Sequence, residues 1–139
     1  MLHLVGYGIE KIYISINYLA DVIVDHFGDG RRFGCAIEYL RETAALGTGG
    51  SLSLLPAKPA HPLIVMNGDL VTQIDVARLL EFHARSGAAA TIAARHYQVE
   101  IPFGVIRHKN HRLVELHEKP SPQYLINTGI YVIDPSLIE

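Results

Sequence analysis

The spacing of apolar side chains alternates along this chain between the period of a strand and that of a helix. Residues 11–16 are rich in β-branched and aromatic side chains and predict a strand. A helix that ends near Gly28 is expected next, because apolar residues follow at helical spacing. Its apolar face consists of Leu19, Val22, Ile23, His26 and Phe27. Such alternation indicates an α/β sheet.

The alternation continues to about residue 94. Residues 33–39 predict a short strand, and the unbroken apolar run 62–66 predicts a strand covered on both faces. Asp75 has the position of an N-cap, and a strand over 88–94 is expected after the helix that it begins. That helix carries on one face Val76, Leu79, Leu80, His83 and Ala84.

After residue 94 the pattern changes to that of antiparallel strands. Residues 103–107 and 113–118 flank a polar, hairpin-like loop at 108–112. A last strand over 125–133 is expected to be interrupted at Asn127-Thr128-Gly129. With no internal repeat and no low-complexity linker, the sequence predicts one continuous α/β unit with an antiparallel extension.

The first eight residues predict the last turns of an amphipathic helix that closes at a glycine. A parallel sheet normally has a strand before such a helix. We therefore expect a further segment upstream of Met1.

Composition narrows the class of function. The 12 basic and 14 acidic residues among 139 are scattered and give a net charge of -2, so we expect no nucleic-acid partner. No apolar run approaches the ~18 residues of a membrane span, and the amino terminus does not resemble a secretory signal. Cys35 is the only cysteine and is expected to be a buried apolar residue in a reducing compartment. A cytoplasmic protein without membrane contacts is the prediction.

Polar segments follow the predicted strands, at the end of an open α/β sheet where ligands usually bind. Leu46–Ser51 contains three glycines, which let backbone amides approach a ligand but also occur in simple turns. Asp69, in Asn67-Gly68-Asp69, could hold Mg²⁺ or only cap a turn. Glu118 and Lys119 suit sugar hydroxyls and phosphate, or form a solvated ion pair.

In this order and spacing the segments resemble the sugar nucleotidyltransferases, the nucleoside-diphosphate-sugar pyrophosphorylases. The likeness covers nearly the whole chain and is nearest to guanylyltransferases of mannose, heptose or glucosamine 1-phosphate, some of which carry regulatory domains. It implies a Rossmann-like, mixed and mainly parallel sheet with helices on both faces. The matching segments are Leu46-Gly47-Thr48-Gly49-Gly50, Asn67-Gly68-Asp69, Phe103-Gly104-Val105, Glu118-Lys119-Pro120 and Asn127-Thr128-Gly129-Ile130-Tyr131.

The resemblance implies a role for each matched position. Asp69 would bind the catalytic Mg²⁺, and Lys119 would lie near the sugar phosphate as the second catalytic residue. The residues expected at the nucleotide are Glu42, Gly47, Thr48, Gly49, Asn67 and Gly68. Those expected at the sugar are Gly104, Glu118, Asn127 and Thr128.

Glu42 bears on the choice of nucleotide. It lies five residues before Gly47, where relatives that use uracil or thymine nucleotides commonly have Gln. Two carboxylate oxygens match the N1–H and the exocyclic amino group of guanine, which favours GTP. The alternative is a solvent-facing charge at the end of a strand.

The implied reaction is attack of a sugar 1-phosphate oxygen on the α-phosphate of GTP, with departure of pyrophosphate. Two family elements have no match in these residues: the glycine-rich triphosphate loop and a second metal-binding Asp, expected upstream and downstream respectively. We therefore expect residues 1–139 to form a partial domain, with little or no activity alone. An uncovered sheet edge or helix face would favour a homo-oligomer.

Two other functions stay open at this point. One is a noncatalytic module that senses nucleotide sugars or regulates another activity. The other is a glycosyltransferase of similar fold, which would usually carry an Asp-x-Asp motif where this chain has Asn67-Gly68-Asp69.

Overall fold

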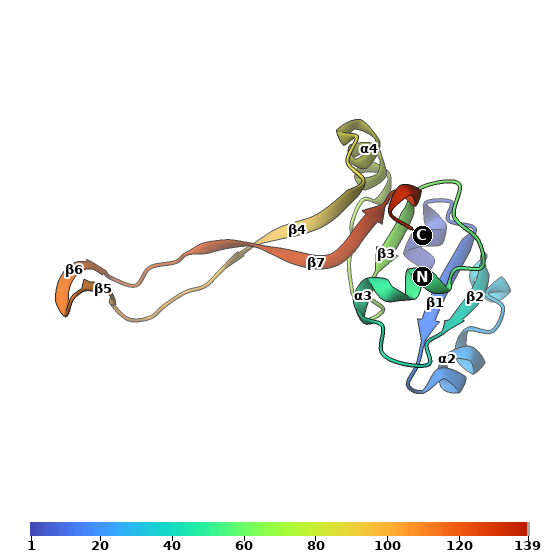
Figure 1. The fold of residues 1–139 in the computed structure, drawn as a ribbon, viewed down its shortest axis with the longest axis horizontal. Helices are drawn as coiled ribbons and strands as arrows, with labels where there is room; N and C mark the ends of the chain where they lie inside the picture. Colours follow the sequence, from blue (N-terminus) through green and yellow to red (C-terminus); the bar gives the residue numbers. More distant parts are fainter. Residues whose placement is uncertain (139) are drawn as a thin grey trace. The chain divides into compact units, whose positions relative to one another are not determined.

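The computed structural model describes residues 1–138, apart from the side chain of Thr48. The chain divides into two compact units (Figure 1). Unit 1 consists of Met1–Thr91 and Ile130–Glu139, and unit 2 of Ile92–Gly129. Helices, one parallel pair of strands and antiparallel sheets together confirm the expected mixed α/β class.

Unit 1 begins with a short helix and a parallel pair of strands. The helix α1 (Leu2–Gly6) confirms the expected helix end. Strands β1 (Lys11–Ile16) and β2 (Ala36–Arg41) pair from Lys11 with Ala36 through Ile16 with Arg41. Ile16, Ile37 and Leu40 are buried and form part of the core.

The connection between β1 and β2 differs from the expectation in two places. Helix α2 (Ala20–Phe27) ends at Gly28 as expected, but Leu19 precedes it in a left-handed conformation, at φ 55°, and is exposed. The strand expected over 33–39 begins only at Ala36, because the 3-10 helix η1 (Arg31–Phe33) closes at Gly34 with φ 81°. Cys35 is buried, as predicted.

A three-stranded sheet forms the second part of unit 1. Strand β3 (Leu63–Met66) pairs antiparallel with β7 (Gln123–Ile133), which also neighbours β4 (Ala90–Gln98). All four residues of β3 are half-buried, so both faces of this strand are covered, but only in part. The strand lies at the edge of the order β3-β7-β4, so it has a paired neighbour on one side only. Ile130 and Val132 of β7 are nearly inaccessible.

Three short helical segments complete unit 1: α3 (Gly47–Gly50), η2 (Ser51–Leu54) and η3 (Pro135–Leu137). The longer helix α4 (Val76–Ser86) follows Asp75, whose Oδ1 accepts the Arg78 N–H at 3.0 Å. This contact confirms the predicted N-cap. No helix in the described part of the chain is long and apolar enough to cross a membrane.

Unit 2 contains a hairpin and the adjoining parts of β4 and β7. Strands β5 (Val105–Lys109) and β6 (Arg112–His117) meet at Asn110 and His111, both with positive φ as a two-residue type I′ turn requires. The loop is therefore shorter than the expected 108–112 and consists of Asn110 and His111.

Strand β7 passes without a break through both units, so the interruption expected at 127–129 is wrong. Gly129 absorbs the irregularity with φ 73°, and its N–H donates to the Asn127 Oδ1 at 2.9 Å. Asn127 and Gly129 thus make a turn-like hydrogen bond without ending the strand.

The cap of α4 gives the first prediction. Replacing Asp75 by Ala removes the acceptor for the Arg78 N–H and should lower the free energy of unfolding by about 1 kcal/mol, measured by urea denaturation. Asp75→Ser keeps a side-chain acceptor and should retain most of the stability. Equal losses in the two variants would contradict a capping role.

Candidate functional site

The predicted nucleotide residues of unit 1 follow the carboxyl ends of two strands. Glu42 extends the β1–β2 ladder, because its N–H donates to the Ile16 carbonyl at 2.9 Å. Asn67-Gly68-Asp69 follows directly after Met66 and is exposed. Carboxyl ends of strands are where open α/β sheets bind ligands.

The Glu42 carboxylate has a hydrogen-bond donor on each oxygen. The Ser15 hydroxyl donates to Oε1, and the Leu46 N–H donates to Oε2 at 3.1 Å. The Ser15 hydroxyl, and after it the Leu46 N–H, hold the pKa of Glu42 below its ordinary value. Glu42 is therefore an anion at neutral pH, and each oxygen keeps a further acceptor site.

The glycine-rich segment begins directly after Leu46, whose N–H donates to Glu42. Gly47 has φ 75°, a conformation that favours glycine, and Gly49 is exposed. At Gly50 a Cβ would lie 2.6 Å from the Cβ of Leu46, so this close approach requires glycine. The side chain of Thr48 lies outside the described residues. Leu46 is thus held at its N–H and lies close to the backbone of Gly50.

Asp69 is the carboxylate expected at the metal. It lies in an exposed turn after β3, and the described residues contain no group of three or more His, Cys, Asp or Glu side chains placed to hold an ion. Mg²⁺ often takes one or two protein carboxylates and completes its shell with water and phosphate oxygens. A single hard oxygen donor such as Asp69 fits that requirement.

In unit 2 the hairpin brings Gly104 and Glu118 together. Val105 pairs with His117, and the next residues outward on each strand are Gly104 and Glu118. A Cβ on Gly104 would lie 3.1 Å from the Glu118 Oε2 and 3.2 Å from the Leu116 Cδ1. The register therefore places these two predicted sugar residues face to face.

The other predicted residues of unit 2 have structural contacts. Lys119 is exposed and has a positive φ of 43°. Asn127 accepts the N–H of Gly129, and the half-buried Thr128 hydroxyl donates to the Ala93 carbonyl at 2.7 Å. Thr128 thus ties β7 to β4.

Two sets of contacts were not predicted from the sequence. Ser15 could not be connected with Glu42 without the β1–β2 register. On the hairpin, Glu115 binds the Arg107 Nη2 at 2.5 Å and the His117 Nε2 at 2.6 Å. The cross-strand alignment of Arg107 with Glu115 was the only available signal for this second cluster.

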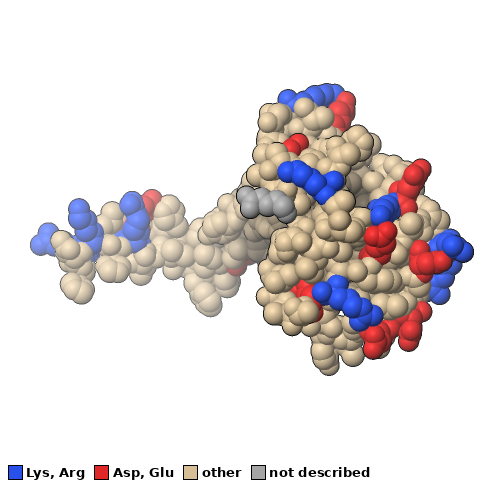
Figure 2. All heavy atoms as spheres, turned by 45° about the vertical axis from the view of Figure 1, so that its right-hand side comes forward, with Lys and Arg blue, Asp and Glu red and all other residues tan. Residues whose placement is uncertain are grey.

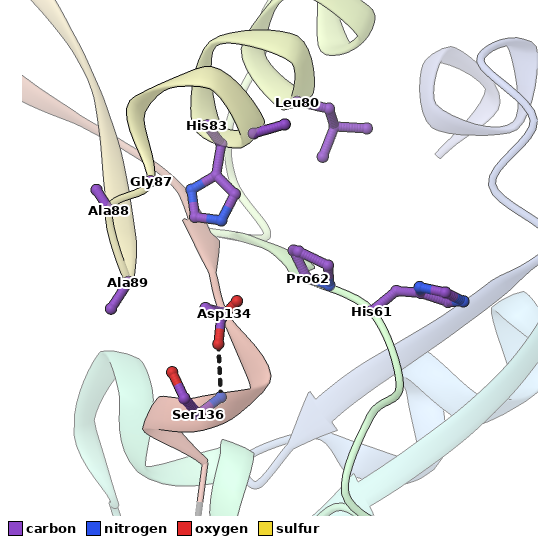
Figure 3. Close-up of a pocket in the computed structure, with 10 residues that line it drawn as sticks. His61, Pro62, Leu80, His83, Gly87, Ala88, Ala89, Asp134 and Ser136 are labelled. Atoms are coloured by element: carbon purple, nitrogen blue, oxygen red, sulfur yellow. Dashed lines mark hydrogen bonds between the residues drawn. The ribbon is translucent and has the colours of Figure 1, made fainter.

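Two hollows of unit 1 lie away from the predicted residues. The larger, of about 630 Å³, adjoins Pro62 and Ala89, directly before β3 and β4 (Figure 3). The second, of about 590 Å³, adjoins Glu10 and Ala36, at the start of β1 and β2. The second hollow thus lies at the amino ends of its strands, whereas the larger lies at the amino ends of β3 and β4 and at the carboxyl end of the antiparallel β7. The larger is lined by His61, Pro62, Leu80, His83, Ala84, Gly87, Ala88, Ala89, Asp134 and Ser136.

Charges of both signs are interspersed over the face of unit 1 that Figure 2 shows. Three of its ion pairs join exposed side chains, and such pairs contribute little to stability. They are Lys11–Glu38, Arg31–Asp29 and Arg41–Asp21.

The order of strands and polar segments can be compared with known proteins. The sequence profile of the nucleotidyl transferase family matches residues 1–139. The chain belongs to the nucleotidyl transferase family. This membership confirms the family resemblance of its sequence motifs.

Two relatives of this nucleotidyl transferase chain are mannose-1-phosphate guanyltransferases. The protein of Yarrowia lipolytica is 32% identical over 141 residues, which cover 95% of this chain and 39% of the relative. That of Mycobacterium tuberculosis, named mannose-1-phosphate guanylyltransferase, is 33% identical over 136 residues, 95% of this chain and 38% of the relative. The chain thus spans about two fifths of the length of these relatives.

A solved structure shows the same fold. HddC from Yersinia pseudotuberculosis superposes with a TM-score of 0.71 and 23% identity, covering 100% of this chain and 62% of HddC. Its complex with GMP-PN superposes with a TM-score of 0.70. At this identity the likeness describes the fold of the nucleotidyl transferase chain.

The Ser15–Glu42 contact gives the second prediction. Ser15→Ala should raise the pKa of Glu42 toward its ordinary value, measured by the pH dependence of its side-chain ¹³C NMR shift. Because the folded pKa is lowered, the contribution of Glu42 to stability is present above the unfolded pKa. It is lost as pH falls through the folded pKa.

Ser136→Ala is a matched control, because Ser136 lowers the pKa of a different carboxyl group, that of Asp134. It should raise the pKa of Asp134 and leave Glu42 unchanged. A titration midpoint of Glu42 that is unchanged in Ser15→Ala would refute the Ser15–Glu42 contact.

Proposed function

We propose that this chain is part of the catalytic domain of a sugar-1-phosphate nucleotidyltransferase, which transfers GMP from GTP to a sugar 1-phosphate. The proposal rests mainly on one observation: Glu42 follows the carboxyl end of β2, and Asp69 lies in the turn after the carboxyl end of β3, in a chain of this family. Relatives named for guanylyl transfer, which are about 2.5 times as long, support the choice of nucleotide. The remaining length would supply the triphosphate loop and a second metal ligand.

Glu42 is the residue proposed to recognise guanine. Its anionic carboxylate keeps one acceptor site on each oxygen, matching the two parallel donors of the base. The backbone of the glycine-rich segment would lie against the nucleotide, with the turn after β3 beside it. These residues are Gly47, Thr48, Gly49, Asn67 and Gly68.

The sugar 1-phosphate would bind residues of unit 2. Glu118 would accept hydrogen bonds from sugar hydroxyls, beside the Gly104 backbone. Lys119 would compensate the charge of the phosphate, and Asn127 and Thr128 would lie at the sugar ring. The names of the relatives make mannose 1-phosphate the first sugar to test.

The reaction joins a phosphate oxygen of the sugar 1-phosphate to the α-phosphorus of GTP. The bond from that phosphorus to the oxygen bridging to the β-phosphate breaks in line, and pyrophosphate leaves. Asp69 would hold a Mg²⁺, which neutralises charge on the phosphates when bound. The chain's residues contribute by holding both substrates in place.

The third prediction tests this function by pyrophosphate release from GTP, mannose 1-phosphate and MgCl₂. The chain alone should release pyrophosphate at a rate close to the blank. A hybrid in which it replaces the matching 38% of the Mycobacterium tuberculosis relative should turn over. Asp69→Asn should lower kcat of the hybrid by about a hundredfold, the equivalent of losing a metal contact in the transition state.

Asp25→Asn, which changes an exposed carboxylate on α2, is the matched control and should leave kcat unchanged. A folded hybrid that binds GDP-mannose without turnover would instead favour a sensing module. Full activity in Asp69→Asn would contradict the metal role.

Self-association is proposed for unit 2. Among the described residues of this unit no hydrophobic side chain is fully buried, and several large ones are exposed. Contiguous exposed apolar surface favours association, so a second copy of the chain is the proposed cover. The most exposed of these side chains are Phe103, Ile106, Leu113, Leu116 and Leu125.

The fourth prediction follows by sedimentation velocity. The chain should sediment as a dimer or larger species, and the double variant Leu113→Lys, Leu125→Lys should shift it to monomer. Val71→Lys, at a still more exposed apolar residue of unit 1, should not. A well-folded monomer of the unmodified chain at high concentration would count against self-association.

A further inference from the structure

Ser15 and Glu42 are brought together by the parallel pairing of β1 and β2. Ser15 is paired with Leu40, so Glu42 is its diagonal neighbour two residues further along the adjacent strand. Residues so related lie on the same face of a sheet, within reach of a long side chain. The Glu42 N–H bond to the Ile16 carbonyl carries the pairing up to this point and fixes the backbone beneath the carboxylate.

The Glu42 carboxylate then closes the turn that follows it. Its Oε2 accepts the N–H of Leu46, four residues on, while its Oε1 accepts the Ser15 hydroxyl. One carboxylate thus joins the end of β1 to the residue that precedes the glycine-rich segment. Hydrogen bonds to an ionised acceptor are among the stronger ones.

Gly50 completes the arrangement from the other side. Its backbone has φ -67° and ψ -27°, which any residue adopts, so its conformation does not require glycine. The requirement is space, because a Cβ would lie 2.6 Å from the Cβ of Leu46. Leu46 is therefore held by Glu42 at its N–H, and it lies so close to the Gly50 backbone that only glycine fits there.

We propose that Ser15 is a positioning residue of the nucleotide site: it orients the Glu42 carboxylate and, through it, fixes the loop from Glu42 to Gly50 to the end of β1. The effect on base selectivity rests on the proposed recognition of guanine by Glu42. With Ser15 in place, the Glu42 carboxylate has one orientation, so the free acceptor site of each oxygen points in a fixed direction. Without it, the carboxylate is held by the Leu46 N–H alone and rotates about its own side chain.

The test compares Ser15→Ala with Ser15→Thr, which keeps a hydroxyl, in the full chain. Amide hydrogen exchange at Leu46, measured by NMR, should be about tenfold faster in Ser15→Ala, the effect of weakening one charge-assisted hydrogen bond. Ser15→Thr should stay close to the unmodified chain. Ser136→Ala, the hydroxyl beside Asp134, is the matched control and should leave Leu46 unchanged.

A second readout separates positioning from a general loss of structure. IDP lacks the exocyclic amino group of GDP, so the ratio of the two affinities measures how well both carboxylate oxygens meet the base. Titration by NMR should show GDP favoured by about tenfold in the unmodified chain, the value of one hydrogen bond to a charged group. The ratio should fall toward one in Ser15→Ala, and Ser15→Thr should restore it.

The two proposals fail in different ways. Unchanged Leu46 exchange in Ser15→Ala overturns the positioning role, whatever the nucleotide affinities are. Equal affinity of the unmodified chain for GDP and ADP contradicts the proposed recognition of guanine, and the exchange of Leu46 then decides the positioning role by itself. Equal loss of affinity for GDP and IDP in Ser15→Ala also counts against orientation of the carboxylate.

Discussion

The register of β1 against β2 is the constraint on which the candidate nucleotide site depends. Six pairs of residues, from Lys11 with Ala36 to Ile16 with Arg41, set where β2 ends relative to β1. Buried Ile16, Ile37 and Leu40 resist a shift, because a slip of one strand would move these side chains out of the positions in which they are buried. Glu42 consequently meets Ser15, and the course of the following loop is set by packing in the core beneath it.

Unit 2 achieves a similar result with an antiparallel hairpin. The turn at Asn110 and His111 fixes the pairing of β5 with β6, and that pairing carries Gly104 to Glu118. A ladder of backbone hydrogen bonds thus positions a carboxylate that lies beyond the end of its strand. Glu42 and Glu118 each lie one position past the end of a strand, whose geometry they inherit.

The features that could be predicted from sequence have local causes. Asp75 precedes a helical pattern and caps it, and the polar residues around Asn110 form the turn of a hairpin. Failures arose where contacts distant in sequence decide the conformation. Strand β7 continues through Gly129, because its neighbours β3 and β4, far apart in the sequence, belong to the same sheet.

The candidate site, too, could be predicted from the sequence only in part. The types of residue and their order along the chain indicated the family, which the comparison confirmed. Which side chains hold those residues could not be found, because Ser15 lies 27 positions from Glu42 and only the parallel register relates them. The roles of Asp69, Lys119 and the candidate sugar residues stay predictions, because these roles consist of contacts with ligands.

The continuity of β7 has a consequence for how the candidate sugar residues can change. Asn127 and Thr128 occupy the same strand as Ile130 and Val132, which are almost wholly buried. Thr128 also holds the Ala93 carbonyl of β4. Any insertion or deletion in this stretch would shift the apolar pair out of the core together with the polar pair. The candidate sugar residues Asn127 and Thr128 can therefore be exchanged one for another, while their number and spacing are fixed by the packing of Ile130 and Val132 in the core.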